Sequence, residues 1–520
     1  MVQQIELKIL PDKVNDESHI TQLQNVILKS VLGKINARIL IKKSIDARGK
    51  RPLYILRYDI YIDEEYKDPQ HEYLNFIDVR KCKTVIIVGS GPAGYFAALQ
   101  CLESGLKPIV LERGKDVRER RRDLKAIQQY GIVNPESNYC FGEGGAGTYS
   151  DGKLYTRSHK RGTVEKVLRL LVGHGANPEI LFDAHPHIGS NKLPEIISNI
   201  RETIEKYGGL VHFNHRVTDI LIEDNKTKGV YCEDLFFEAD KVILATGHSA
   251  RDMYHILHNK GVYIEAKPFA LGLRIEHKQA YIDRVQYKQE NREENLPASS
   301  YSVVTQVHGK GVFSFCMCPG GLVVPAATTP GEIVVNGMSL SRRDSPYANS
   351  GFVTSIELDE LEKYGFNGVF ASLNFQSDIE RRMFEASDGS QKAPAQRVND
   401  FVNGILSETL NDTSYIPGLI SAPLHTILPK FIYDRLRQGL IDINKKMKGY
   451  VSDEANIIGV ESRTSAPIRI PRDPITFCHP NIEGLYPVGE GAGYAGGILS
   501  AAMDGQNVIY AITSQANSEK

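Results

Sequence analysis

The sequence predicts an α/β protein built around a parallel β-α-β unit. Residues 84–88 form a β-branched apolar run that leads directly into the G-x-G-x-x-G pattern of Gly89, Gly91 and Gly94. In such a turn the three glycines allow a tight bend, close approach of the backbone to a pyrophosphate, and close packing of the next helix on the sheet. Glu112 ends the next apolar run, where a carboxylate can bind both hydroxyls of an adenosine ribose. Together these features predict a dinucleotide site that favours an unphosphorylated ribose.

The glycine pattern alone is weak support, because the chain matches it three times. The second match begins at Gly142 and the third at Gly491. The Gly142 match lacks a preceding strand and continues as Thr-Tyr-Ser-Asp-Gly, which is typical of a turn. Only the match at Gly89 combines a strand, a helix and an acidic residue, so it alone predicts a dinucleotide site.

Length and composition indicate a large protein with several domains. The 520 residues correspond to about three domains at the usual ~150 residues each, and 41% hydrophobic residues are enough for a large core. The net charge of −1 gives no overall attraction to nucleic acid or to an anionic membrane. Seven scattered cysteines fit a reducing compartment, so the expected location is cytoplasmic. We expect no signal peptide and no membrane span, which needs ~18 apolar residues.

Residues 1–80 are predicted to form a small βαββ domain followed by a polar linker. Apolar residues alternate along residues 5–9 as in a strand, and those between 20 and 31 fall at helical spacing, with Gly33 as the stop. Two further strands are expected at 38–45 and 53–62. A charged segment then predicts the linker.

The rest of the chain is predicted to form a nucleotide-binding domain that another domain interrupts. Residues 81–260 form its first part, and residues 456–520 form its second part, with a strand, a glycine cluster and a helix. Residues 261–455 are predicted to form a mixed α+β domain, because the pattern changes to short alternating strands. We expect these strands at 269–275, 301–307, 311–317 and 332–338.

A second glycine-rich turn lies near the C-terminus. Residues 485–498 read Leu-Tyr-Pro-Val-Gly-Glu-Gly-Ala-Gly-Tyr-Ala-Gly-Gly-Ile and precede a helical run. A strand that ends at Gly489 and Glu490 places a carboxylate where it can bind sugar or ribityl hydroxyls, and amides near Gly497 and Ile498 begin a helix. Two nucleotide-contacting elements so far apart in the sequence imply one long ligand.

Several motifs resemble the glutathione-reductase-type FAD-binding fold. These are the first G-x-G-x-x-G, the Ile-Leu-Ala-Thr-Gly at 243–247 and the Leu-Tyr-Pro-Val-Gly-Glu at 485–490. More narrowly, the segments 140–157, 315–321 and 461–469 resemble the bacterial "uncharacterised FAD-dependent dehydrogenase" family, from about residue 80 to the end. The resemblance implies a Rossmann-type (ββα) FAD-binding domain interrupted by a substrate domain, and hydride or electron transfer through the flavin to or from a small molecule.

The resemblance also implies cofactor contacts. The first glycine turn would bind the pyrophosphate, Glu112 the adenosine ribose, and the backbone of Val217 the adenine. Glu490 stands where related flavoenzymes usually have Asp, and its extra methylene shifts the contact with the ribityl chain. The expected FAD contacts are Gly89, Ser90, Gly91, Pro92, Ala93, Gly94, Glu112, Arg113, Gly145, Ala146, Gly147, Lys153, Val217, Thr246, Gly247, Gly489, Glu490, Gly497 and Ile498.

Candidate catalytic residues are Cys316, Cys318, His187 and Arg343. Alternation in a strand would place the sulfurs of Cys316 and Cys318 on one face, although two small buried side chains are the alternative. His187 could donate a proton near neutral pH, but an H-x-H pair alone is poor evidence for zinc, so no metal site is expected. An anionic substrate could be held by Arg342, Arg343 or Arg463.

Two charged segments and the absence of a second nucleotide motif complete the prediction. The run 113–125 is expected to be a solvated helix, and the basic segment 34–57 a solvated hairpin rather than an RNA-binding surface. Residues 250–455 hold no second strand-G-x-G-x-x-G-helix unit, so NADH or NADPH would bind transiently in the substrate cleft. The sequence thus predicts a FAD-dependent oxidoreductase with a small-molecule substrate and an electron-donor partner. The alternatives are a flavin-dependent RNA-modifying enzyme and a flavin redox sensor or scaffold.

Overall fold

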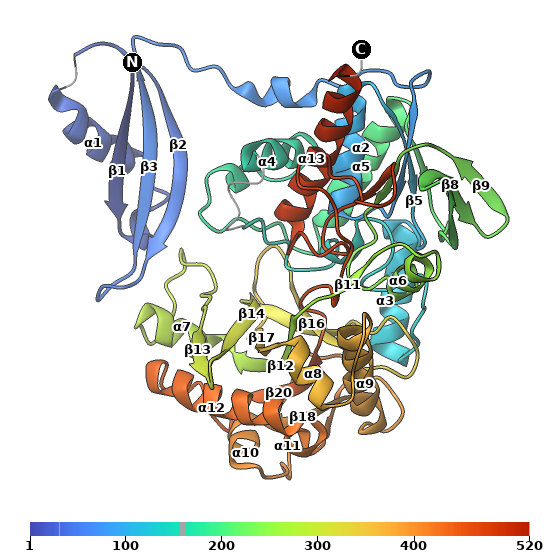
Figure 1. Ribbon diagram of the computed structural model, residues 1–520. Coiled ribbons are helices and arrows are strands. Elements are labelled where there is room, and N and C mark those ends of the chain that lie inside the picture. Colours follow the sequence, from blue (N-terminus) through green and yellow to red (C-terminus); the bar gives the residue numbers. More distant parts are fainter. Residues whose placement is uncertain (31, 156–162, 519–520) are drawn as a thin grey trace.

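The computed structural model describes residues 1–30, 32–155 and 163–518 (Figure 1). Val31 of the predicted helix and Thr156 and Arg157 of the family motif lie outside the described residues. The chain begins with a three-stranded antiparallel sheet of order β1-β3-β2, made of β1 (Val2–Ile9), β2 (Ile35–Asp46) and β3 (Leu53–Ile62). Helix α1 (Glu17–Ile27) lies between β1 and β2 in the chain, which confirms the predicted order strand, helix, strand, strand. Asp16 caps this helix by accepting a hydrogen bond from the His19 amide.

This N-terminal sheet contacts the rest of the protein on two sides. The Lys43 amide of β2 donates to the Phe182 carbonyl oxygen at 2.7 Å, and the Ala184 amide donates back to the Lys43 carbonyl oxygen at 2.9 Å. The Tyr54 hydroxyl of β3 donates to the Asn295 carbonyl oxygen at 2.5 Å. These contacts come from segments far apart in the sequence, and they fix the position of the N-terminal sheet.

A five-stranded parallel sheet of order β22-β10-β4-β5-β6 forms the centre of the nucleotide-binding part. Its strands are β4 (Thr84–Val88), β5 (Lys107–Leu111), β6 (Leu210–His212), β10 (Val242–Leu244) and β22 (Leu485–Pro487). Strand β22 returns to this sheet from near the C-terminus, so the predicted interruption of the domain is a feature of the topology. The parallel order explains the apolar strands, because both faces of the sheet are covered.

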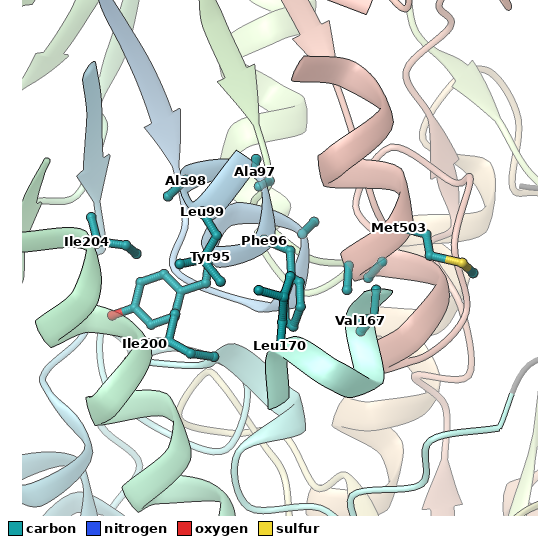
Figure 2. Packing of buried hydrophobic residues seen from close by; sticks show 14 of the residues in the cluster. Tyr95, Phe96, Ala97, Ala98, Leu99, Val167, Leu170, Ile200, Ile204 and Met503 are labelled. Atoms are coloured by element: carbon teal, nitrogen blue, oxygen red, sulfur yellow. The ribbon is translucent and has the colours of Figure 1, made fainter. Parts of the chain in front are cut away.

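One face of this sheet is covered by four helices, α2 (Pro92–Ser104), α4 (Val164–Gly173), α5 (Leu193–Lys206) and α13 (Ile498–Ser518). Figure 2 shows Tyr95, Phe96 and Leu99 of α2 among residues of α4, α5 and α13. A Cβ at Gly505 of α13 would collide with the Ala93 carbonyl oxygen, so this glycine allows α13 to approach α2 closely.

The opposite face is covered by a small antiparallel sheet and by helix α6 (Arg251–Asn259). The small sheet contains β7 (Asp219–Glu223), β8 (Lys226–Cys232) and β9 (Leu235–Glu238). Ile220 and Val230 of this sheet share one apolar cluster with Ile86 and Val88 of β4. The three layers are therefore helix, parallel sheet and antiparallel sheet, which is the predicted ββα arrangement.

The second large part is a mixed sheet of order β13-β14-β17-β12-β20-β18-β19, as the α+β prediction requires. Its strands are β12 (Phe269–Lys278), β13 (Val304–Val307), β14 (Lys310–Cys318), β17 (Tyr347–Ile356), β18 (Ala393–Arg397), β19 (Leu419–Ser421) and β20 (Asn456–Glu461). Strand β20 pairs with β12 and β18, although we assigned residues from 456 onward to the nucleotide-binding part. Its short apolar centre at 457–460 fits either sheet, so the pattern could not place it.

Helices and short strands complete this part of the chain. The helices are α7 (Gln279–Tyr287), α8 (Leu358–Lys363), α9 (Ala371–Glu385), α10 (Val398–Asn403), α11 (Leu424–Ile427) and α12 (Lys430–Lys446). Two short strand pairs are β15 (Gly321–Pro325) with β16 (Val335–Ser339) and β11 (Glu265–Ala266) with β21 (Ile468–Arg469). The first pair reaches the cavity described below through Asn336. Within the described ranges, every helix is too short or too polar to cross a lipid bilayer.

Candidate cofactor-binding site

A cavity lies along the carboxyl ends of the parallel strands β4, β5, β10 and β22. Residues just beyond each strand line it, namely Gly89, Glu112, Thr246 and Gly489. Ligands of open α/β sheets bind at this edge, because loops and helix N-termini converge there. The cavity continues to Phe315 of β14, so its far end is formed by the mixed sheet.

Most of the expected cofactor contacts meet in this cavity. Its lining includes Gly89, Gly91, Pro92, Ala93, Glu112, Arg113, Gly145, Ala146, Gly147, Val217, Thr246, Gly247, Gly489, Glu490, Gly497 and Ile498. Ser90, Gly94 and Lys153 lie outside the lining. Ser90 is buried and hydrogen-bonded to Glu112, and Lys153 Nζ donates to the Met317 carbonyl oxygen. These three residues support the wall instead of facing the cavity.

The glycines of the first turn hold the strand and the helix together. Gly89 has a φ of +104°, and a Cβ there would lie 2.5 Å from the Ala245 carbonyl oxygen of the neighbouring strand end. A Cβ at Gly94 would collide with the Gly89 carbonyl oxygen. A side chain at Gly89 would push the turn away from the segment after β10, and one at Gly94 would push α2 away from the turn, so the two glycines set the shape of the turn.

Two helix N-termini are oriented so that they reach the cavity. Helix α2 begins at Pro92 after Gly91, which has no side chain to cap the helix, and α13 begins at Ile498. Unpaired amides and the helix dipole at such ends attract phosphate oxygens. A Cβ at Gly247 or Gly497 would meet no atom within 4 Å, so the backbone is open to the cavity at both positions. This arrangement fits a pyrophosphate.

Glu112 joins three backbone segments at one end of the cavity. Its Oε2 accepts hydrogen bonds from the Ser90 amide at 3.0 Å and from the Ser90 hydroxyl at 2.8 Å. Its Oε1 accepts from the amides of Gly114 and Gly142, both at 2.9 Å. The carboxylate is therefore held rigidly where it lines the cavity.

Arg113 closes the same end of the cavity. Its guanidinium lies 4.1 Å from the centre of the Phe141 ring, and it pairs with Glu136 at 2.9 Å and with Asp252 at 3.0 Å. The two carboxylates and the ring fix the plane of the guanidinium. Val217, expected to meet an adenine, lines the cavity beside Arg216.

Glu490 lies on the opposite wall, at the end of β22. Its Oε1 accepts a hydrogen bond from the Gly497 amide, and its Oε2 lies 3.6 Å from His248 Nε2. Glu490 thus caps the start of α13 and faces a histidine that the sequence analysis did not single out. His248 directly follows the Ala-Thr-Gly turn, and this position is the one signal that could have identified it.

Arg120 is a structural residue that the sequence analysis missed. It lies on helix α3 (Val117–Tyr130), which was expected to be solvated, yet its side chain is fully buried. Its guanidinium and Nε donate to the carbonyl oxygens of Asn138, Tyr139, Glu143 and Gly145 at 2.8–2.9 Å. The expectation is correct for exposed neighbours such as Arg122 and wrong for Arg120, which holds the glycine-rich loop in place.

The cysteine prediction is wrong in its geometry. The pairing of β14 with β17 shifts between Phe315 and Cys318, and Cys316 has a φ of +45°. This bulge breaks the simple alternation, so Cys316 is exposed and lines the cavity whereas Cys318 is buried. Burial raises the pKa of the Cys318 thiol to about 11. The two sulfurs therefore do not share one face.

The other candidate catalytic residues lie outside the lining of the cavity. His187 Nε2 lies 3.1 Å from the Ser341 carbonyl oxygen, and burial lowers the pKa of this histidine. Arg343 forms an ion pair of 2.5 Å with Asp151. Its guanidinium is already neutralised there, so the structure does not support Arg343 as the group that holds an anionic substrate. The described residues contain no group of side chains suited to a metal ion.

Arg463, the third candidate for an anionic substrate, lines the cavity and belongs to a buried ionic cluster. It pairs with Glu332 at 3.1 Å and with Glu380 at 3.0 Å, and Arg251 contacts the same two carboxylates at 3.0 and 2.7 Å. Burial tends to raise the pKa of Glu380, but Arg251 and Arg463 outweigh it and lower the pKa to about 2. Burial and the Glu380 carboxylate raise the pKa of Glu332 to about 7. Arg463 is therefore committed to internal carboxylates.

Three segments of the chain match known protein families. Residues 268–464 match the family described as "FAD-dependent protein, C-terminal domain-like", residues 83–297 match "Pyridine nucleotide-disulphide oxidoreductase", and residues 1–61 match a domain of unknown function. An uncharacterised protein of Clostridium beijerinckii is 38% identical over 510 residues, which are 93% of this chain and 95% of that protein. The chain belongs to this family of uncharacterised FAD-dependent bacterial proteins.

The FAD-dependent protein also resembles solved structures at low identity. CtdE in complex with FAD is 13% identical, with a TM-score of 0.33 over 83% of this chain and 84% of that chain. Glycine oxidase from Bacillus cereus is 13% identical, with a TM-score of 0.31 over 84% of this chain and 96% of that chain. Likenesses this distant identify no substrate. The family matches make the protein an FAD-dependent oxidoreductase.

Proposed function

We propose that FAD lies along the cavity, with its adenosine end near Glu112 and its flavin end near residues 145–147. The observation that carries this proposal is the convergence of two helix N-termini and a glycine wall on one cavity. The proposed contacts are Gly89, Gly91, Pro92, Ala93, Glu112, Arg113, Gly145, Ala146, Gly147, Val217, Thr246, Gly247, Gly489, Glu490, Gly497 and Ile498. Bound FAD supplies hydride or electron transfer, and the protein supplies orientation and electrostatics.

The residues of the chain provide a site in which a small molecule can meet the flavin. Glu112 and Arg113 fix one end of the cofactor, and the loop held by Arg120 forms the wall beside residues 145–147. Phe315 and Cys316 of the mixed sheet bound the other end. We propose that the substrate enters from this side, between the nucleotide-binding part and the mixed sheet.

The RNA-modifying alternative has less support, because basic residues of the N-terminal sheet have internal partners. Arg48 pairs with Asp46 at 2.7 Å, and Arg57 pairs with Glu6 at 3.2 Å. Arg38 donates to the Gln24 side chain at 2.9 Å. The two carboxylates reduce the positive charge available to an RNA backbone, and the Gln24 contact orients the Arg38 side chain toward the protein. A redox sensor would need the same flavin site. The test that distinguishes a sensor from an enzyme is whether a metabolite reduces the bound flavin.

Replacement of Glu112 by glutamine is expected to weaken FAD binding. The change removes the negative charge and one acceptor, and a hydrogen bond to a charged group contributes about 1.5–3 kcal/mol, at least about tenfold in Kd. Quenching of flavin fluorescence on titration of the apoprotein measures the Kd. Glu119→Gln, an exposed substitution on α3, is the matched control. Equal Kd values for both variants and the native protein would refute the assigned role of Glu112.

Anaerobic mixing with NADH or NADPH is expected to bleach the flavin absorbance. We propose that the nicotinamide binds transiently at the Phe315 end, because the one parallel sheet among the described strands is used by the proposed FAD site. Stopped-flow absorbance measures the rate of bleaching. If neither nucleotide bleaches the flavin and a metabolite extract does, the donor is a different small molecule. If none of them does, the protein is better explained as a sensor.

A further inference from the structure

A smaller cavity adjoins the cofactor cavity and shares part of its wall. Both are lined by Cys140, Ala146, Ser150, His248, Asn336 and Arg463. The smaller cavity is completed by Tyr139, Tyr149 and the strand pair β15–β16. If FAD occupies the larger cavity, as proposed above, the shared wall is where a second molecule would meet it.

A chain of four polar side chains runs along this shared wall. Ser249 Oγ lies 3.3 Å from Cys140 Sγ and 3.0 Å from His248 Nδ1. On the far side of the imidazole, Nε2 lies 3.6 Å from Glu490 Oε2. All four residues line the cofactor cavity, although they come from the glycine-rich loop, the segment after β10 and the end of β22.

The electrostatic surroundings of His248 favour its neutral form. Burial lowers the pKa of His248, Arg463 and Arg251 act in the same direction, and Glu490 and Glu380 oppose them. Glu490 favours the tautomer with its proton on Nε2, which leaves Nδ1 as an acceptor for the Ser249 hydroxyl. The Ser249 hydroxyl also donates to Cys140 Sγ. When this hydroxyl rotates toward His248 Nδ1, its oxygen can accept from the Cys140 thiol instead.

We propose that Cys140, Ser249, His248 and Glu490 form a proton relay that links the substrate side of the flavin site to Glu490. This inference rests on the proposed FAD site for its function but not for its geometry. When the Cys140 S–H bond breaks, its proton passes to Ser249 Oγ while the Ser249 hydroxyl proton passes to His248 Nδ1. The products are a Cys140 thiolate and a His248 imidazolium paired with Glu490. The reverse transfer returns the proton to the thiol.

The relay suits a substrate that exchanges a proton as the flavin exchanges a hydride. An alcohol or an amine loses both when it is oxidised, and an unsaturated bond gains both when it is reduced. Cys140 and His248 both face the smaller cavity, so such a substrate would contact the relay at its thiol end. Arg463 faces the same space but is neutralised by Glu332 and Glu380, which favours an uncharged substrate over a carboxylate.

Alkylation of Cys140 tests the relay without any substrate. Iodoacetamide reacts with the thiolate, so the rate of modification reports how readily Cys140 loses its proton. Near neutral pH, Ser249→Ala and His248→Gln are each expected to slow alkylation of Cys140 about fivefold, as measured by peptide mass spectrometry of the purified protein. Ser249→Thr keeps the hydroxyl and is expected to restore the rate.

Cys316 is the internal control, because it faces the same cavity but lies outside the relay. Its rate of alkylation is expected to stay within about twofold of the native value in all three variants. Equal slowing at both cysteines would indicate altered access and would overturn the relay, as would an unchanged Cys140 rate in Ser249→Ala and His248→Gln. Flavin content, measured on the same samples, reports separately on the proposed function. If the purified proteins contain no flavin but alkylation of Cys140 still slows in Ser249→Ala and His248→Gln, the result would contradict the FAD site and support the relay.

Discussion

The Arg120→Met variant is expected to lose bound flavin and to unfold more readily than the native protein. The guanidinium of Arg120 is the common donor for four carbonyl oxygens of the segment 138–145. Methionine fills a similar volume but donates no hydrogen bond, so these buried carbonyl groups lose their partner. Each hydrogen bond to a charged group contributes about 1.5–3 kcal/mol, and relief of the buried charge offsets part of this, so we expect a net loss of about 3 kcal/mol.

The loss is expected to be largest in flavin binding, because the loop held by Arg120 forms the cavity wall at residues 145–147. A Cβ at Gly142 would lie 2.6 Å from the Arg120 Cδ, so the loop and the arginine are closely fitted to each other. Flavin fluorescence released on denaturation measures the occupancy, and urea unfolding measures the free energy. Arg122→Met, an exposed substitution on the same helix, is the control. If both variants retain the native flavin content, Arg120 does not hold the cofactor wall.

The contrast between Glu112 and Arg120 shows what could be predicted from the sequence. Glu112 directly follows an apolar strand that comes after the glycine turn, so the neighbouring residues in the sequence are enough to place it at the edge of the sheet. Arg120 stands among other charged residues of an amphipathic helix, and its acceptors are main-chain carbonyl groups, which are the same for every residue type. No side-chain pattern marks such acceptors. The same reasoning explains why the bulge at Cys316 could not be predicted, because it depends on the register of β14 against β17.

The strand order was predictable in part. The return of β22 to the parallel sheet followed from two glycine-rich turns that imply one ligand, and the ββα layers followed from the resemblance, whereas the place of β22 beside β10 was not predicted. Strand β20 was assigned to the wrong side of the boundary, because a short apolar strand pairs equally well with any open sheet edge. The relay of Cys140, Ser249, His248 and Glu490 joins three distant segments, and only the folded chain brings them together.

The Glu380→Gln variant is expected to lose about 3–5 kcal/mol of stability, because it leaves two buried guanidinium groups without their main carboxylate partner. Glu380 Oε2 accepts from Arg251 at 2.7 Å and from Arg463 at 3.0 Å, and Oε1 accepts from Ser462 at 2.5 Å. The side chain of Glu380 is fully buried. Glutamine keeps the size and one acceptor, so the expected loss comes from the charge. Urea unfolding measures it, with Glu385→Gln at the exposed end of α9 as the control.

The lowered pKa of Glu380 also predicts how the free energy of unfolding changes as the pH falls. Because the native pKa of Glu380 is lowered from 4.5 to about 2, the unfolded chain takes up this proton first as the pH falls. The contribution of Glu380 is therefore fully present above about pH 4.5 and is lost progressively toward pH 2. Glu332 has the opposite effect, because its raised native pKa of about 7 makes its contribution fall as the pH rises from 4.5 to 7. Below pH 4.5 the free energy of unfolding should thus fall less steeply in Glu380→Gln than in the native protein and in Glu385→Gln. Parallel curves for all three proteins would mean that the arginines are balanced by other groups.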